Sequence, residues 1–208
     1  FHFFGDRLLG GGGESDGSVT PARTQSYFAR AYGIEGDVFE LTVSADSPLV
    51  GMALGEAETL HGAPLLLALK TGNDSRLAPP GDARIWVGSV IGAMGPRQQV
   101  ADFAQNNMLR MSTRLREFGD LFNPSRAGIS EAVVPPTSKF IGKSAAELAM
   151  RKNYGISLLA VNRDKEVLRD DVRNMPLRAG DMLVLHSIWQ DLAQTAANRD
   201  FVVVTDFP

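Results

Sequence analysis

The second half of the chain alternates between short apolar runs and one-sided apolar stripes. Short runs bounded by polar turns are typical of buried strands, and stripes with a period of three or four residues are typical of helices. The pattern predicts the order strand, helix, strand, strand, strand, helix, at residues 130–134, 145–152, 156–162, 166–169, 182–186 and 191–197.

The first half of the chain repeats this pattern at a nearly constant distance. Three pairs of matching residues are 91, 91 and 92 positions apart: Gly51 and Gly142, Glu56 and Glu147, and Gly88 and Gly180. A spacing this regular over roughly forty residues indicates duplication of one supersecondary unit. The four glycines are interpreted as structural turns, because glycine adopts backbone conformations that other residues avoid.

The repeat divides the chain into four segments. Residues 1–36, with consecutive glycines at 10–13, are expected to form a tether and a short helix around residues 25–32. Residues 37–108 are the first copy, and residues 129–208 are the second copy with an exit strand. Residues 109–128 are expected to be a helical linker, because apolar side chains continue at helical spacing through Val100, Ala104, Met108, Met111, Leu115 and Phe118.

The tripeptide Gly142-Lys143-Ser144 matches the end of a phosphate-binding loop. Such a loop needs a further glycine five positions earlier so that the backbone can wrap around the anion, and that position is Thr137. The first copy has Met52-Ala53 where the second has Lys143-Ser144. Only the glycine is shared, so the sequence favours a structural turn over an NTPase site.

The composition excludes several classes of function. A formal net charge of −3 argues against a nucleic-acid partner, which requires a basic face, and the lack of cysteine excludes disulfides and thiolate metal sites. His2, His61 and His186 are not at metal-ligand spacing, and His186 is interpreted as a strand-end residue at a sheet edge. No catalytic nucleophile with its base is recognisable, so we expect neither an enzyme nor a cofactor or metal site.

Charged residues crowd the segment 163–181. Five basic side chains alternate with five acidic ones: Arg163, Lys165, Arg169, Arg173 and Arg178, with Asp164, Glu166, Asp170, Asp171 and Asp181. Exposed pairs of this kind contribute about 0 to 1 kcal/mol each. The balance predicts a solvated surface whose charges pair among themselves.

The two ends of the chain are unusual for a complete soluble protein. The sequence opens with FHFF and without an initiator Met, and it stops just after the apolar residues 201–204. No apolar run approaches the roughly 20 residues that span a bilayer. We therefore expect a soluble segment cut from a longer protein.

The repeated unit resembles the C-terminal domain of potassium-conductance regulators, RCK_C or TrkA_C. The features that carry the resemblance are a glycine between strand and helix, a glycine-ended helix, an alternating hairpin and the Gly180-Asp181 turn. The resemblance covers residues 129–197 well and residues 37–104 less well, where Ser89 replaces the expected Asp after Gly88. It implies an α+β fold, with two tandem β-α-β-β-β-α units joined by a helix.

Two such units in tandem, flanked by apolar residues, resemble the cytoplasmic insert of SLC13-type (divalent anion:sodium symporter-like) permeases. That resemblance implies a soluble regulatory region on the cytoplasmic side of the inner (plasma) membrane. Its partner would be the transmembrane part of the same polypeptide, which would transport a dicarboxylate or sulfate together with sodium. The chain would be a homodimer through the parent transporter. Two alternatives stay open: a potassium-channel or potassium-uptake regulator, with a Rossmann domain before each unit, and a free-standing ligand-binding or oligomerisation module.

Domains resembling this one bind small anionic effectors where two copies meet, so the resemblance implies an effector cleft between the units. A cyclic dinucleotide or an adenine nucleotide would suit it. The candidate residues are Arg151 and Lys152, at the end of the predicted helix, and Arg163, beyond the next strand.

Overall fold

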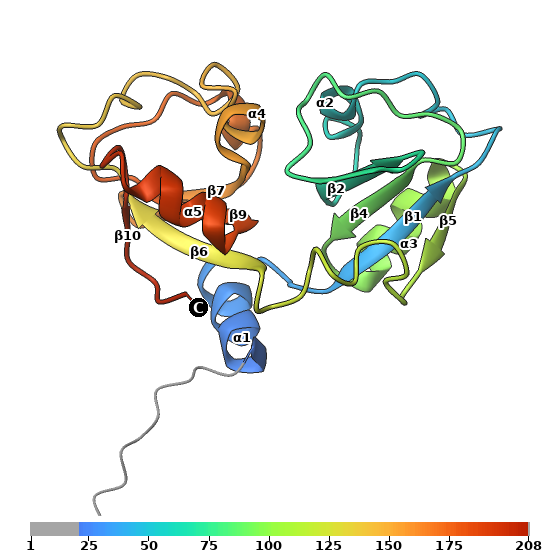
Figure 1. Ribbon diagram of the computed structural model, residues 1–208, viewed down its shortest axis with the longest axis horizontal. Helices are drawn as coiled ribbons and strands as arrows, with labels where there is room; N and C mark the ends of the chain where they lie inside the picture. Colours follow the sequence, from blue (N-terminus) through green and yellow to red (C-terminus); the bar gives the residue numbers. More distant parts are fainter. Residues whose placement is uncertain (1–20, 208) are drawn as a thin grey trace, which may run out of the picture.

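The computed structural model describes residues 21–207, so the predicted glycine tether at 10–13 lies outside the described residues. Two five-stranded antiparallel sheets lie side by side, each with its own hydrophobic core. Helix α1 (Pro21–Tyr32) lies below the place where the two sheets meet (Figure 1). The expected short helix near residues 25–32 is present and begins four residues earlier.

The first unit is built around a sheet of strand order β3-β2-β4-β1-β5. Its core contains aliphatic and aromatic side chains from β1, β4 and α3, among them Leu41, Ile91 and Phe103. Its elements are β1 (Val38–Val43), α2 (Leu54–Ala57), β2 (Leu65–Thr71), β3 (Asp74–Leu77), β4 (Val90–Met94), α3 (Arg97–Asn106) and β5 (Leu109–Ser112).

The second unit has a sheet of order β8-β7-β9-β6-β10. Its core includes Phe140, Leu185 and Leu192. Its elements are β6 (Ala127–Val133), α4 (Met150–Tyr154), β7 (Ile156–Arg163), β8 (Glu166–Leu168), the 3-10 helix η1 (Val172–Asn174), β9 (Met182–Ile188), α5 (Trp189–Ala196) and β10 (Val202–Val203).

The two sheets have one topology, because each strand of the first has a counterpart at the same place in the second. Even an irregularity recurs: the pairing of β2 with β4 shifts between Leu66 and Ala68, and that of β7 with β9 shifts between Leu158 and Ala160. The expected α+β fold with order β-α-β-β-β-α is confirmed, and each unit adds a last strand, β5 or β10.

The glycine shared by the two copies makes the same turn in both. Gly51 and Gly142 each have φ +82°, a conformation that side chains with a Cβ rarely adopt. The Gly51 amide donates to the carbonyl of Ile85 at 2.7 Å, and the Gly142 amide donates to that of Leu177 at 2.8 Å. In both units this hydrogen bond joins the glycine turn, which precedes the short helical segment, to the loop that leads into the fourth strand.

The predicted helical linker is wrong. Helix α3 ends at Asn106. Two residues later Met108 has a left-handed backbone (φ +53°), and the chain continues as strand β5 at the sheet edge beside β1. Apolar spacing misled the prediction because Leu109 and Met111, two positions apart, equally suit one face of a strand. Phe118 is buried instead against Ala68 and Val90.

The predicted helix at 145–152 is displaced. Residues 145–149 form turns, and the helix begins only at Met150, after Ala149 with φ +46°. It ends at Tyr154, where Gly155 takes a left-handed conformation as a helix-ending glycine does. Arg151, the second residue of this helix, bonds across the space between the units to Glu58, the residue that follows α2.

Candidate functional site

A cavity of about 650 Å³ lies between the two units. The first unit lines it with the α2 region, the start of β2 and residues 80–82. The second unit lines it with residues 145–152, the start of β7 and η1. These are counterpart segments, so the cavity lies where the same parts of both units face each other.

An apolar interface closes the cavity from below. Leu67 of the first unit packs in one cluster with Leu159 and Val184 of the second. Phe28 and Tyr32 of helix α1 belong to the same cluster and are 1% and 5% exposed. Burying one such side chain contributes about 1.5 to 3 kcal/mol, so this cluster holds the two units and α1 together.

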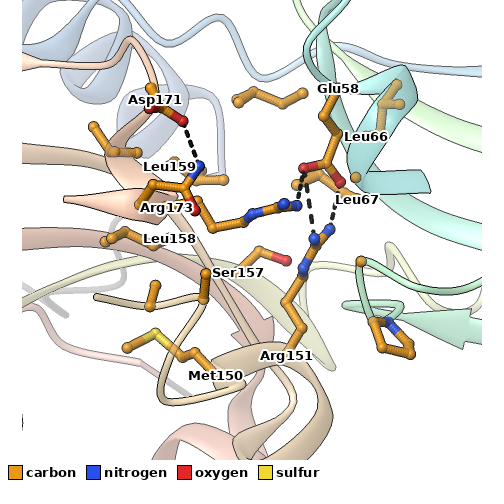
Figure 2. Close-up of a pocket in the computed structure, with 18 of the residues that line it drawn as sticks. Glu58, Leu66, Leu67, Met150, Arg151, Ser157, Leu158, Leu159, Asp171 and Arg173 are labelled. Carbon is orange, nitrogen blue, oxygen red and sulfur yellow. Dashed lines mark hydrogen bonds and ion pairs between the residues drawn. The ribbon is translucent and has the colours of Figure 1, made fainter. Parts of the chain in front are cut away.

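One carboxylate of the first unit binds two arginines of the second. Glu58 Oε1 accepts from Arg151 Nη1 at 2.5 Å, and Glu58 Oε2 accepts from Arg173 Nη1 at 2.7 Å (Figure 2). The side chains of Arg151, Glu58 and Arg173 are 11%, 22% and 30% exposed. Two partly buried guanidinium groups thus share one partly buried carboxylate. The exposed residues of the cavity lining carry charges of both signs, on Asp82, Lys152, Arg169, Asp170 and Asp171.

The structure brings two of the three predicted ligand residues to the cavity. Arg151 and Lys152 both line it, and Lys152 is exposed. Arg163 lies apart from the cavity lining and pairs with Asp181, with Nε to Oδ1 at 2.8 Å and Nη2 to Oδ2 at 2.7 Å. The hydrogen bond to Asp181 raises the pKa of Arg163.

Arg173 was missed as a site residue. The sequence placed it in a surface whose charges pair among themselves, but it bonds instead to Glu58 of the other unit. Arg169 likewise leaves that surface and donates to the carbonyl of Gly33 at 2.8 Å. No local pattern reveals these contacts, because the partners are 115 and 136 residues away along the chain.

The interpretation of His186 is also wrong. It lies in β9, the central strand of the second sheet, and is 2% exposed. Burial lowers its pKa to about 4, so the imidazole is neutral at pH 7. Its ring centroid is 5.5 Å from that of Phe122, and no described residue bonds its Nδ1.

Ser157 faces His186 directly across the β7–β9 pair, so both side chains project from the same face of the sheet. Ser157 lines the cavity, is 5% exposed, and its hydroxyl also has no hydrogen-bond partner among residues 21–207. Figure 2 shows this hydroxyl on the side of the cavity where Arg151 and Arg173 reach Glu58. A buried hydroxyl without a partner is costly unless something else satisfies it.

A buried glutamate at counterpart places ties each unit to a neighbouring segment. Glu40 in β1 accepts from the backbone amides of residues 116–118, at 2.9, 2.7 and 2.9 Å. Glu131 in β6 accepts from the hydroxyls of Tyr27, at 3.0 Å, and Tyr32, both in α1. Burial and the nearby carboxylate raise the pKa of Tyr32, so its hydroxyl stays protonated.

No helix in the described part of the chain combines the length and the apolar character that a membrane crossing needs. Within residues 21–207, no three His, Asp or Glu side chains gather where they could hold a metal ion. Charged and hydrogen-bonding side chains of arginine, lysine, glutamate, aspartate and serine line the cavity.

Residues 129–198 match the TrkA-C domain family. The chain is homologous to segments of two proteins described as uncharacterized transporters. It is 21% identical to sll0640 of Synechocystis sp. (strain ATCC 27184 / PCC 6803 / Kazusa) over 93% of this chain and 31% of that protein. It is 31% identical to YfbS of Escherichia coli (strain K12) over 37% of this chain and 13% of that protein. The chain thus spans about a third or less of these relatives.

Among solved structures, the chain is similar to the RCK C domain of the potassium transport protein KtrA, solved in complex with cyclic diadenosine monophosphate. That likeness has 32% identity and a TM-score of 0.31, and covers 35% of this chain and 82% of the other. It is also similar to the GsuK RCK domain, with 11% identity and a TM-score of 0.32 over 78% of this chain and 63% of the other. Both TM-scores are low.

Proposed function

We propose that the chain is the regulatory part of a membrane transporter and that a small anionic effector binds in the cavity between its two units. The observation that carries this is the sharing of Glu58 by Arg151 and Arg173, which places two partly buried guanidinium groups beside a single partly buried carboxylate at the seam between the units. An anion entering there meets guanidinium groups whose present partner belongs to the other unit.

Such binding would act on the arrangement of the units. An anion that takes Arg151 or Arg173 from Glu58 replaces a bond between the units by a bond to the ligand. A ligand shifts an equilibrium only by its differential affinity for the two arrangements, and typical couplings are about 1 to 3 kcal/mol. That range is sufficient to modulate a transporter several-fold.

Calorimetric titration of the chain with cyclic di-AMP, AMP and ATP tests the effector site. We expect binding of at least one of them, weakened roughly tenfold or more by Arg151→Ala, because a hydrogen bond to a charged group is lost. Lys152→Ala should weaken binding less, since Lys152 is exposed. Lys143→Ala, an exposed cation outside the cavity lining, is the matched control and should not change the affinity. No heat and no thermal shift with any nucleotide would contradict the proposal.

The transported substrate is proposed on the sequence resemblance alone. It favours sodium-coupled uptake of a dicarboxylate or sulfate by the transmembrane part of the same polypeptide, with a homodimeric parent protein and this chain on its cytoplasmic side. Sodium-dependent uptake of labelled succinate and sulfate by vesicles holding the parent protein is the test. Potassium uptake in the same vesicles, with Rossmann domains in the parent sequence, would favour the alternative of a potassium regulator.

The chain itself is proposed to catalyse nothing. The turn at Gly142 leaves Lys143 exposed, and Ser144 uses its hydroxyl to accept from the Glu147 amide at 3.1 Å. Phosphate release from ATP incubated with the chain should stay at the rate of buffer. A rate that falls in the Lys143→Ala variant would contradict this proposal.

A further inference from the structure

The two walls of the cavity come from counterpart segments but differ in chemistry. Ser157 has Leu65 as its counterpart, and the strand partners repeat the difference, since His186 pairs with Ser157 and Met94 pairs with Leu65. Arg173 corresponds to Gly81: the carbonyl of each accepts from the amide of the counterpart residue, Ala146 or Gly55.

The partly buried charges follow the same division. Arg151 and Arg173, the partly buried cations, both come from the second unit. The first unit supplies Glu58, the one partly buried carboxylate among the described cavity residues. The partly buried cations that could hold an anion therefore come from the second unit, and their guanidinium groups reach across to Glu58, Gly55 and Gly81 of the first.

We infer that the cavity takes a ligand with two unlike ends: a single anionic group, held by Arg151, Arg173 and the Ser157 hydroxyl, and an uncharged body that lies against the first unit. A twofold-symmetric ligand with two equal phosphates fits less well. Its second phosphate would meet Leu65 where the first meets Ser157. It would also have to share the same two guanidinium groups, because Arg151 and Arg173 both reach over Gly81 to Glu58.

Ser157 provides the independent observation that points to a ligand. Its hydroxyl faces the cavity without a partner among the described residues, and a buried donor and acceptor of this kind is normally satisfied. A phosphate or carboxylate oxygen is a strong acceptor for a hydroxyl, and the two nearby guanidinium groups supply charge-assisted hydrogen bonds to the same anion.

This inference rests on the proposed effector site, and a matched pair of probes separates the two. AMP has one phosphate and one adenosine, and cyclic di-AMP is built from two such halves related by a twofold axis. Calorimetry of the whole chain should give a dissociation constant for AMP at least about tenfold lower than that for cyclic di-AMP. Ser157→Ala should raise the AMP constant by roughly five- to tenfold, which corresponds to one net hydrogen bond.

Two further variants sharpen the test. Ser130→Ala removes another buried hydroxyl that has no partner among the described residues, from a position outside the cavity lining, and should leave the AMP constant unchanged. Leu65→Ser places a serine in the first unit at the counterpart of Ser157. It should reduce the ratio between the dissociation constants of cyclic di-AMP and AMP. Thermal unfolding of each variant confirms that it is folded.

Each outcome decides one of the two claims. Tighter binding of cyclic di-AMP than of AMP, or an AMP constant unaffected by Ser157→Ala, would overturn the inference while leaving the effector site in place. Binding of neither probe would overturn the effector site and the inference together.

Discussion

The two units solve the same structural problem with different side chains, most plainly at the turn into the fourth strand. In the second unit, Asp181 accepts from the backbone amide of Arg178 at 2.8 Å and binds Arg163 on the neighbouring strand. Asp181 is 1% exposed, so this charge is paired inside the protein.

The first unit makes the same contacts without charge. Ser89 stands at the counterpart of Asp181, and its hydroxyl accepts from the amide of Trp86 at 3.0 Å. Thr71, the counterpart of Arg163, lies 2.9 Å from the same hydroxyl, oxygen to oxygen. The pair of hydroxyls therefore occupies the place of the ion pair.

The duplicated fold is therefore specified by its backbone hydrogen bonds, and the side chains next to these bonds can change. Gly88 and Gly180, with φ +83° and +85°, donate at 2.8 Å to Val43 and Val134 in the two units. The departure of Ser89 from the family pattern thus leaves the turn intact. It changes how the turn should respond to mutation.

Removing the carboxylate of the second unit should give the largest loss. Asp181→Ala leaves the Arg163 guanidinium, whose side chain is 14% exposed, without its partner, and we expect a loss of about 3 to 5 kcal/mol in the free energy of unfolding. Ser89→Ala removes only neutral hydrogen bonds and should cost about 1 to 2 kcal/mol. Urea unfolding of both variants measures the difference.

Each unit has one tryptophan, Trp86 in the first and Trp189 in the second, so fluorescence can follow the units separately. Single-tryptophan backgrounds, Trp189→Phe and Trp86→Phe, assign each transition. Equal losses from the two turn variants would break the comparison, because they would show that the ion pair behaves as a neutral pair does.

Acid should distinguish the units next. His186 has a folded pKa of about 4 against about 6.5 in an unfolded chain, so the unfolded state binds more protons between these values. The free energy of unfolding therefore falls as the pH drops from 6.5 to 4, by about 3 kcal/mol, and is unaffected by this residue above pH 6.5. Urea unfolding followed through Trp189 at pH 4.5 and pH 7.5 measures it.

The first unit supplies the control, because the counterpart of His186 is Met94, which does not titrate. His186→Met should remove most of the pH dependence between 4 and 6.5. A slope that persists in this variant would trace the acid sensitivity to other groups. Asp191 would not supply it, because burial raises the pKa of its carboxyl, so protonation of Asp191 favours the folded state.

A smaller effect should follow from releasing helix α1. Tyr32→Phe deletes the hydroxyl that donates to Glu131, while Tyr27 still binds that carboxylate, and we expect a loss of about 1.5 kcal/mol. Hydrogen exchange measurements should show faster exchange of the α1 amides. The exchange rates of residues 109–118, which are tied to Glu40 in the other unit, should not change. Faster exchange in both segments would mean that the two glutamates are coupled.

The smallest difference concerns the glycine turn. Lys143 is exposed, and Lys143→Ala should change the free energy of unfolding by no more than about 0.5 kcal/mol. Its counterpart Met52 packs against the first core, so Met52→Ala should be measurably less stable. Thermal melts of both variants check this, and an equal loss would mean that the counterpart side chains share one environment.

The local patterns of the sequence predict much of the fold. The alternating runs at 156–162 and 182–186 appear as β7 and β9, and the shared glycines at Gly51 and Gly142 appear as equal turns. Period and turn chemistry act over a few residues, so they can be recognised without knowledge of the rest of the chain.

The contacts that make the site could not be predicted in the same way. Arg151 was recognised as a charge at a helix end, but its partner Glu58 lies 93 residues earlier, and nothing near Arg173 indicates that it faces the same carboxylate. The wrong prediction of a helix at residues 109–112 has a related cause. The apolar spacing there suits a helix or a strand, and pairing with the edge strand β1 makes it a strand.

Residues 113–126, held by Glu40 and Phe118, connect the two units covalently, so the cavity should persist when the protein is diluted. In an assembly of separate chains, a cleft between two copies disappears when the protein is dilute. Here the second half stays near the first at an effective concentration of the order of millimolar, as short tethers give. Occupancy of the cavity should therefore depend on ligand concentration alone, with one ligand per chain even in nanomolar protein.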